Sequence, residues 1–139
     1  MFKKLNKKGF TLAELLIVVA IIGVLVAISI PIFTSQLKKA HLATNQANAR
    51  AAYAAVVAKL LENEKTSGKA TYTVSTAKVG AIAAADADDG TTTASPNDWS
   101  YDTSSTASYK EAQLGTLTAT AWTINIKDDG TISYTPAWS

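Results

Sequence analysis

The sequence predicts an α+β fold, in which one long N-terminal helix carries a small antiparallel β-sheet on its C-terminal half. Three observations support this prediction. No charged residue occurs at positions 15–37, and apolar residues at alternating three- and four-residue spacing continue from there to about residue 63. Near the C-terminus, apolar and polar residues alternate on both sides of a turn sequence, which is typical of a β-hairpin. The 139 residues leave room for one modest domain.

The uncharged run is long enough to cross a membrane. As a helix it would be about 35 Å long, whereas the hydrocarbon core of a bilayer is about 30 Å thick. Glu14 stands just before the run, where an ionised carboxylate needs a partner to offset its loss of water. The basic residues upstream are Lys3, Lys4, Lys7 and Lys8. Such a cluster marks the cytoplasmic side, so we expect the residues after the run to lie outside the cytoplasm.

Two residues weaken the helix within this run. Gly23 costs about 1 kcal/mol relative to Ala in a helix interior. Pro31 lacks an amide hydrogen and crowds the carbonyl of Ala27, so we expect a kink or a local loss of helical structure. Gly23 and Ala27 are also small residues four positions apart, a spacing that allows another helix to approach closely.

After Phe33 the helix changes character and shows two apolar strips. The first is a heptad seam of mostly small residues, namely Leu37, Ala40, Thr44, Ala47, Ala51, Ala54, Ala58 and Leu61. The second contains Tyr53, Val56, Val57 and Leu60. A helix that is apolar on two sides is expected to be buried on two sides, one against a sheet and one against neighbouring subunits. The alternative is that the alanines only favour helix formation.

Beyond residue 63 the pattern predicts turns and strands. Residues 71–75 alternate and suggest a short strand, 78–85 are ambiguous between strand and helix, and 86–98 read as a loop closed by Pro96. The hairpin is the clearest element. Trp122, Ile124 and Ile126 alternate with polar residues, the sequence Asp128-Asp129-Gly130 forms a turn, and Ile132 and Tyr134 resume the alternation.

The sequence Lys7-Lys8-Gly9-Phe10-Thr11-Leu12-Ala13-Glu14, followed by the apolar run and Pro31, resembles the class III signal of type IV pilins. The resemblance extends from Lys7 to about Asn63. It implies that a prepilin peptidase cleaves between Gly9 and Phe10 and then N-methylates Phe10. It also implies that Glu14 pairs with a Phe10 amine during assembly, and that the stretch between Gly23 and Pro31 can lose helicity in the filament.

This resemblance implies a division of the chain and a function. Residues 1–9 would be a cleaved leader, 10–33 a transmembrane and filament-core helix, and 34–139 a globular domain, with helix over 34–63 and loop and sheet over 64–139. The protein would be a structural subunit of a type IV pilus and not an enzyme. Its partners would be copies of itself, the prepilin peptidase and an inner assembly platform. It would lie in the cytoplasmic membrane before assembly and in a surface filament afterwards, which could serve motility, adhesion or DNA uptake.

Four alternatives remain open. The N-terminus could be an ordinary secretory signal cleaved after Ser29, or an unprocessed membrane anchor; Glu14, Pro31 and the length of the apolar run count against the first. The chain could also be a pseudopilin of a type II secretion or DNA-uptake system. The last alternative is a monomeric binding module tethered to the membrane.

Composition bears on other functions. Residues 1–9 hold four of the 13 basic residues, so the remainder has 9 basic and 11 acidic residues and offers no basic surface for nucleic acid. The sequence contains no Cys, unlike many pilins of Gram-negative bacteria, which favours a Gram-positive source and excludes disulfides.

No cofactor or metal is expected. Residues 86–90 contain three Asp, but the spacing of Gly90 and Asn97 does not match a calcium-binding EF-hand loop. His41 is the single histidine, which leaves no histidine pair for a metal cluster and suggests a surface or packing role. We expect Trp99, Trp122 and Trp138 to fill a small core.

Overall fold

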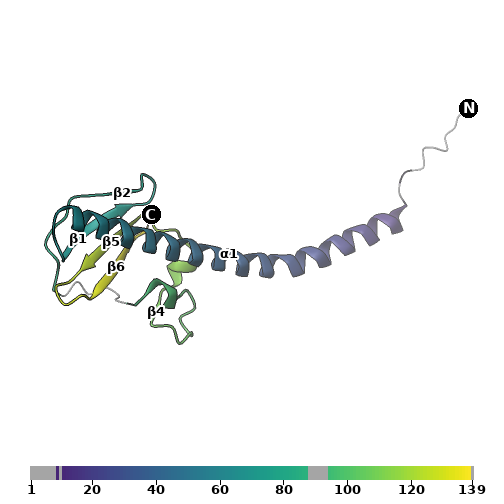
Figure 1. The fold of residues 1–139 in the computed structure, drawn as a ribbon. Helices are drawn as coiled ribbons and strands as arrows, with labels where there is room; N and C mark the ends of the chain where they lie inside the picture. The colour runs from purple at the N-terminus through teal and green to yellow at the C-terminus, as the bar shows by residue number, and fades with distance from the viewer. Residues whose placement is uncertain (1–8, 10, 88–93, 139) are drawn as a thin grey trace, which may run out of the picture. The chain divides into compact units, whose positions relative to one another are not determined.

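The fold is described from a computed structural model, in which residues 9, 11–87 and 94–138 are placed (Figure 1). The described chain divides into two compact units, the first ending at Gln36 and the second beginning at Leu37. Helix α1, Leu12–Glu62, contributes to both units. The division between the two units therefore falls within this helix.

The first unit contains the apolar part of α1, in which every residue from Leu12 to Gln36 is exposed. The helix continues without interruption through Gly23 and Pro31. Two hydroxyl groups near Pro31 bond to the backbone, with Ser29 Oγ donating to the Leu25 carbonyl at 2.6 Å and Thr34 Oγ1 to that of Ile30 at 2.9 Å. These bonds satisfy the hydroxyls within the helix, as an apolar environment requires. Among the described residues, α1 is the one helix long and apolar enough to cross a membrane.

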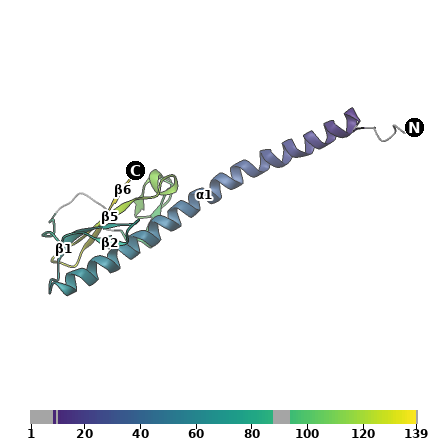
Figure 2. The same ribbon diagram turned by 90° about the horizontal axis from the view of Figure 1, so that it is seen from above.

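The second unit is built on an antiparallel sheet, which confirms the predicted fold class. Among the described residues, this sheet has four strands in the order β2-β1-β5-β6 (Figure 2). The strands are β1 Gly68–Thr73, β2 Lys78–Val79, β5 Ala121–Ile126 and β6 Ile132–Ala137. The predicted hairpin is confirmed, since β5 and β6 pair with Ile126 opposite Ile132 and Ile124 opposite Tyr134. Strand β1 pairs antiparallel with β5 along its whole length. Gly68 lies opposite Ile126 at one end of this pairing, and Thr73 lies opposite Ala121 at the other.

The sequence-based boundaries were less accurate outside the hairpin. Strand β1 starts at Gly68, three residues before the predicted strand, because its pairing with β5 extends to Ile126. Of the ambiguous segment 78–85, β2 takes only two residues, and Ala83 adds an isolated bridge to Lys69. A small parallel pair, β3 Trp99–Ser100 and β4 Tyr109–Lys110, was not predicted. It is accompanied by the short 3-10 helices η2 Pro96–Asp98 and η3 Ala112–Gly115.

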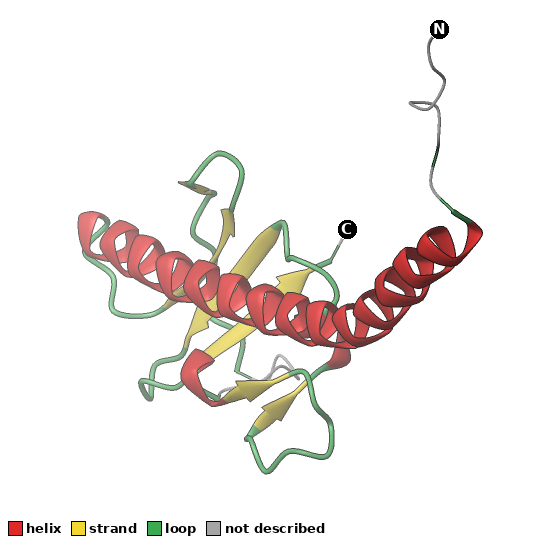
Figure 3. Cartoon of the chain, turned by 90° about the vertical axis from the view of Figure 1, so that its right-hand side faces the viewer, coloured by secondary structure: helices red, strands yellow, loops and turns green. Residues whose placement is uncertain are grey.

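The C-terminal part of α1 lies across one face of the four-stranded sheet (Figure 3). The buried residues of this helix are Asn45, Ala49, Ala52, Val56 and Leu60. Val56 and Leu60 belong to the second predicted strip, so that strip faces the sheet. All residues of the heptad seam are exposed in the single chain. The sheet therefore covers only one of the two apolar sides of α1.

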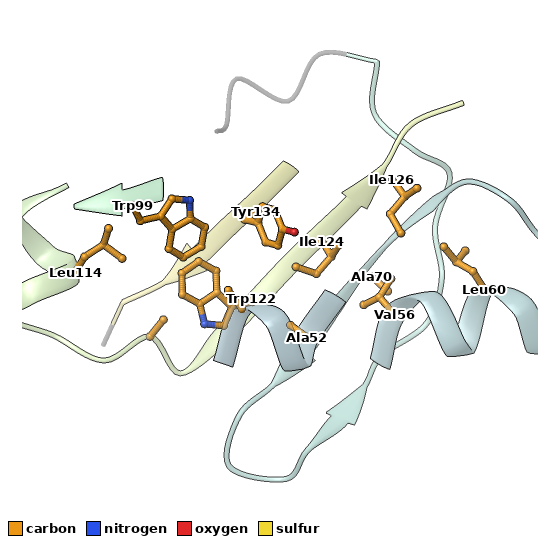
Figure 4. Packing of buried hydrophobic residues seen from close by; sticks show 12 residues of the cluster. Ala52, Val56, Leu60, Ala70, Trp99, Leu114, Trp122, Ile124, Ile126 and Tyr134 are labelled. Carbon is orange, nitrogen blue, oxygen red and sulfur yellow. The ribbon is translucent and has the colours of Figure 1, made fainter. Parts of the chain in front are cut away.

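The core combines small helix residues with large sheet residues. Ala52, Val56 and Leu60 face Ala70 and the isoleucines of β5, while Trp99, Trp122 and Tyr134 fill the other end of the cluster (Figure 4). The Trp99 and Trp122 rings are stacked with centroids 5.1 Å apart. Both rings are buried, which confirms their predicted role in the core.

Candidate processing and assembly site

The N-terminus of α1 is closed by a reciprocal pair of hydrogen bonds between Thr11 and Glu14. The Thr11 amide donates to Glu14 Oε2 at 2.9 Å, and the Glu14 amide donates to Thr11 Oγ1 at 3.2 Å. The Thr11 carbonyl accepts the first helical hydrogen bond, from the Leu15 amide at 3.1 Å. This arrangement is a capping box with Thr11 as the N-cap residue. It satisfies two of the amides that any helix leaves unpaired at its start.

Glu14 therefore has a partner within its own chain. Its carboxylate lies in the first turn of α1, where the partial positive charge of the helix N-terminus favours an anion. The capping bond uses Oε2. A carboxylate can accept several hydrogen bonds, so this capping bond still leaves acceptor capacity for an amine. The pattern Thr-x-x-Glu before an apolar run indicates a capping box in the sequence. Our interpretation of the sequence assigned Glu14 to pairing with an amine and did not predict this capping role.

The predicted cleavage site lies immediately before this cap. Gly9 is exposed and non-helical, and a Cβ placed on it would meet no atom within 4 Å. Thr11 is also exposed and outside the helix proper. Phe10 lies outside the described residues, as do Lys3, Lys4, Lys7 and Lys8 of the predicted leader. The predicted cleavage site thus lies between two described residues, Gly9 and Thr11, that are exposed and precede α1.

The other predicted assembly residues lie along the exposed part of α1. Gly23 and Pro31 are both exposed, and a Cβ on Gly23 would meet open space. Ala27, the partner of Gly23 in the predicted small-residue pair, is exposed as well. Nothing in the single chain covers these positions among the residues that the structure describes.

The loop at residues 86–98, which the sequence did not support as a calcium site, is described only in part. Asp86 forms an ion pair with Lys69, with Nζ and Oδ2 2.5 Å apart. Its backbone is held by Asn125, which accepts from the Asp86 amide at 3.1 Å and donates to the Asp86 carbonyl at 2.9 Å. Asp88, Asp89 and Gly90 lie outside the described residues. Among residues 9, 11–87 and 94–138, no three His, Asp or Glu side chains are grouped as metal ligands would be.

His41 and Trp138 occupy packing positions. His41 is half-buried, with Nδ1 3.2 Å from the Thr118 hydroxyl oxygen. Trp138 is half-buried, its ring centroid lies 6.3 Å from that of Trp122, and its Nε1 donates to Glu111 Oε1 at 3.0 Å. Both residues therefore contribute to the second unit, as expected from the sequence.

Comparison with known proteins agrees with this N-terminal site. A family model described as the prokaryotic N-terminal methylation motif matches residues 4–30. The chain thus carries this motif at the segment that the sequence pattern indicated, and the similarity to known proteins lies there. It is 49% identical over 53 residues to the type IV narrow pilus major component PilA5 of Thermus thermophilus, a match that covers 36% of this chain and 46% of the relative.

A second relative is the fimbrial protein EcpB of Eikenella corrodens, which is 53% identical over 37 residues, or 27% of this chain and 23% of the relative. The matched part therefore spans less than half the length of either relative. No solved structure matches the chain. The similarity to curated proteins thus covers only part of the chain, and the two relatives are described as a pilus component and a fimbrial protein.

Proposed function

We propose that the chain is a structural subunit of a type IV pilus, assembled through its N-terminal helix. The observation that carries this proposal is the exposed apolar part of α1. From Leu12 to Phe33 the large apolar side chains are exposed, including Leu16 at 61% and Phe33 at 70%. Such a surface is strongly unfavourable in water, so it requires a membrane or other protein around it.

The methylation motif and the capping box support processing before assembly. In this proposal the prepilin peptidase removes residues 1–9 and N-methylates Phe10. The mature chain then consists of a membrane and filament-core segment, residues 10–33, and a globular part, residues 34–139. Cleavage creates a cation at Phe10, and methylation retains it. Glu14, one helical turn away, is the acidic group in reach of that charge, either in its own chain or in a neighbouring subunit.

Assembly transfers the apolar helix from the membrane into the filament core. Each subunit leaves the cytoplasmic membrane with help from an inner assembly platform and joins a surface filament of identical subunits. Gly23 and Ala27 allow close approach of neighbouring helices. The second unit would face outward and its role would be structural rather than catalytic. The two relatives support this role, since one is described as a pilus major component and the other as a fimbrial protein.

The test is to delete the native copy and restore either the wild-type chain or the variant Gly9→Val. We expect the wild type to give surface filaments by electron microscopy and a mature N-terminus of N-methyl-Phe10 by mass spectrometry. Gly9→Val should remain unprocessed in the membrane, because a branched side chain replaces the hydrogen at the cleavage position. The control is Gly80→Ala in the second unit, where a Cβ would meet its nearest atom at 3.7 Å, an ordinary contact.

Two results would contradict the proposal. A mature terminus at Ile30 would indicate an ordinary secretory signal. Retention of Met1 in a protein that stays in the membrane would indicate a tethered module.

A further inference from the structure

A groove opens at the end of the second unit, where the last turns of α1 meet the turn between β5 and β6. It has a volume of about 350 Å³ and is lined mainly by the apolar residues Tyr53, Val57, Leu60, Leu61, Ile126 and Ile132. Leu60 and Ile126 are buried, at the end of the core away from Trp99 (Figure 4). Leu61 is 68% exposed. We call this feature the distal groove, and its apolar walls are open to another molecule.

The border of the distal groove is acidic. Glu64 follows α1, and Asp128 and Asp129 lie in the turn between β5 and β6; all three are exposed. Lys65 and Lys127 are the basic residues of the same two segments, so three acidic residues face two basic ones. An apolar groove with an excess of negative charge at its border fits an apolar side chain that is accompanied by basic residues.

Such a segment stands at the opposite end of the second unit. Among the described residues of this unit, the large apolar residues that are more than a third exposed are Leu37 at 47%, Leu61 at 68% and Leu117 at 38%. Leu61 belongs to the groove itself, and Leu117 stands between two threonines. Leu37 instead precedes Lys38 and Lys39, which are both exposed and are the one adjacent pair of basic residues in the described chain.

The surroundings of Lys38 keep this end basic. The acidic group close to it is Asp102, in the loop between β3 and β4. Hydrogen bonds from Ser104 lower the pKa of Asp102, and the charges of Lys110 and Lys38 lower it further. Asp102 thus lies near two lysines and offsets only part of their charge. The charges at the two ends of the second unit are therefore complementary.

We propose that Leu37, Lys38 and Lys39 of one copy dock into the distal groove of a second copy of this chain. The inference rests on the proposed function, which places many copies in one filament. Leu37 and Leu61 are about 36 Å apart along α1, so a chain cannot fill its own groove. The two surfaces differ, so the contact is heterologous and continues from copy to copy instead of closing a pair. A fibre requires a contact of this kind.

The contact cannot form between two copies that are both anchored in a membrane. Their apolar segments lie at the same depth, so their second units stand level with each other. Docking requires a shift of about 36 Å along α1 between the two copies. The contact is therefore specific to copies that have assembled, and it fixes the axial offset between the second units that it joins.

Introduced cysteines test the contact directly, since the sequence contains no Cys. Ala40→Cys marks the end that carries Leu37, and Thr66→Cys marks the groove that Thr66 helps to line; both positions are exposed and uncharged. They stand at opposite ends of the second unit, so a short bismaleimide reagent cannot join them within one chain. The full-length chain is produced in a strain that lacks the native copy, and sheared filaments and membranes are treated separately.

We expect the two-cysteine chain to form a ladder of dimers, trimers and longer species in the filament fraction. The same chain in the membrane fraction should remain monomeric. Each single-cysteine chain should remain monomeric in both fractions, because a head-to-tail contact brings the two different positions together and not two copies of one position.

Charge reversal tests the contact without cysteines. One chain carries Lys38→Glu with Lys39→Glu, and a second carries Glu64→Lys with Asp128→Lys. We expect each to lower the yield of sheared filaments about tenfold, because like charges then face each other across the contact. The chain with all four substitutions restores opposite charges, and its yield should return to within about threefold of wild type.

The matched control for charge reversal is Glu62→Lys, which should keep the wild-type yield. At 3.6 residues per turn, Glu62 lies on the side of α1 opposite Tyr53 and Val57, away from the groove. Thermal unfolding followed by tryptophan fluorescence checks that every variant is folded, since Lys38→Glu places a second negative charge near Asp102.

The outcomes separate this inference from the proposed function. Filaments in which the two-cysteine chain crosslinks no better than the single-cysteine chains would overturn the docking contact alone. A ladder in the membrane fraction would overturn it as well, and so would a four-substitution chain that assembles no better than the two reversed chains. If the wild-type chain forms no filaments, the proposed function is wrong and the contact that rests on it is rejected too.

Discussion

Nε1 of Trp138 donates a hydrogen bond to Oε1 of Glu111 at 3.0 Å, joining the C-terminal end of the chain to the segment between β4 and η3. The other carboxylate oxygen, Oε2, accepts from the hydroxyl of Tyr109. The carboxylate of Glu111 thus accepts hydrogen bonds from two aromatic side chains, Trp138 and Tyr109, which lie in separate segments of the second unit. Their rings contact the buried Trp122 and Trp99, respectively.

Glu111→Gln should destabilise the second unit by about 1–2 kcal/mol. The amide of Gln can accept from Trp138 and donate to the Tyr109 hydroxyl, but both hydrogen bonds then lose the negative charge that strengthens them. Thermal unfolding followed by tryptophan fluorescence measures the change. The matched control is Glu64→Gln, an exposed position in the turn after α1, which should stay within about 0.5 kcal/mol of wild type. Equal stability of the two variants would contradict the role assigned to Glu111.

The second unit should lose stability as the pH rises above about 10. Burial raises the pKa of Tyr109, and the hydrogen bond and negative charge of Glu111 raise it further. Burial also raises the pKa of Tyr134. In the unfolded chain these phenols ionise near pH 10, while in the folded chain they stay protonated to higher pH. Above pH 10 the unfolded chain therefore binds fewer protons, and the free energy of unfolding falls with increasing pH.

Urea unfolding at intervals between pH 8 and pH 11 measures this dependence. Stability should be nearly constant below pH 9 as far as these groups contribute. Tyr109→Phe should reduce the slope above pH 10, and the control is Tyr101→Phe, which removes a half-buried phenol but keeps the hydrogen bond between Tyr109 and Glu111. A slope that is the same in all three chains would show that Tyr109 is not responsible.

Asn45→Ala should be among the most damaging substitutions in the second unit. Its fully buried side chain donates to the carbonyls of Leu114 and Leu117 at 3.0 and 2.9 Å and accepts from the Ala119 amide at 3.0 Å. Removing it leaves three backbone groups without this partner, at a cost of about 3 kcal/mol. The neighbouring Asn48→Ala is the control, and chemical unfolding of the two variants should differ by about 2 kcal/mol or more.

Glu14→Ala should leave membrane insertion intact and strongly reduce filament yield. The substitution removes a charge from an apolar helix, which favours insertion, and Thr11 can still cap the Glu14-position amide, so cleavage should continue. Loss of one member of a buried charge pair in the filament costs about 3–5 kcal/mol. Membrane and sheared-surface fractions measure both effects, with Glu62→Ala in the same helix as the control. Normal yield of normally methylated filaments would exclude the charge pair as the determinant of assembly.

The helix should lose regular structure between Gly23 and Pro31 when the subunit enters a filament. In the single chain the helix is continuous there. Pro31 nevertheless provides no amide for the Ala27 carbonyl, and Gly23 adds backbone freedom. A filament map from electron cryo-microscopy should show extended chain in this stretch. Unbroken helix through Ala27 in such a map would rule the prediction out.

The parts of the fold that could be predicted from the sequence are those determined by short-range patterns. Helix α1 was predicted to end at about residue 63 and ends at Glu62, and the hairpin of β5 and β6 was predicted from its alternation and turn. The two-residue strands β3 and β4 are too short to produce any alternation, and they exist because their partners meet in space. Asn45 could not be recognised either, because its partners lie at least 69 residues away in the sequence.

The same contrast between short-range patterns and long-range contacts applies to the candidate site and to the faces of α1. The capping box of Thr11 and Glu14 is a local signal and could have been read directly from the sequence. By contrast, no local pattern indicates which side of α1 contacts the sheet. The seam and the opposite strip are both apolar, but in the folded unit Val56 and Leu60 lie in the core with Ala70 and Ile124, whereas the seam is exposed.

The order of strands limits the ways in which many copies can associate. The outer strands of the described sheet are β2, which has two residues, and β6, which contains Pro136. A strand that short offers almost no template for a further strand, and proline has no amide hydrogen with which to extend a ladder. Copies of the chain at high local concentration are thereby less able to join at their sheet edges into amyloid-like aggregates. In the proposed filament, this favours ordered growth through the helices over uncontrolled growth through strands.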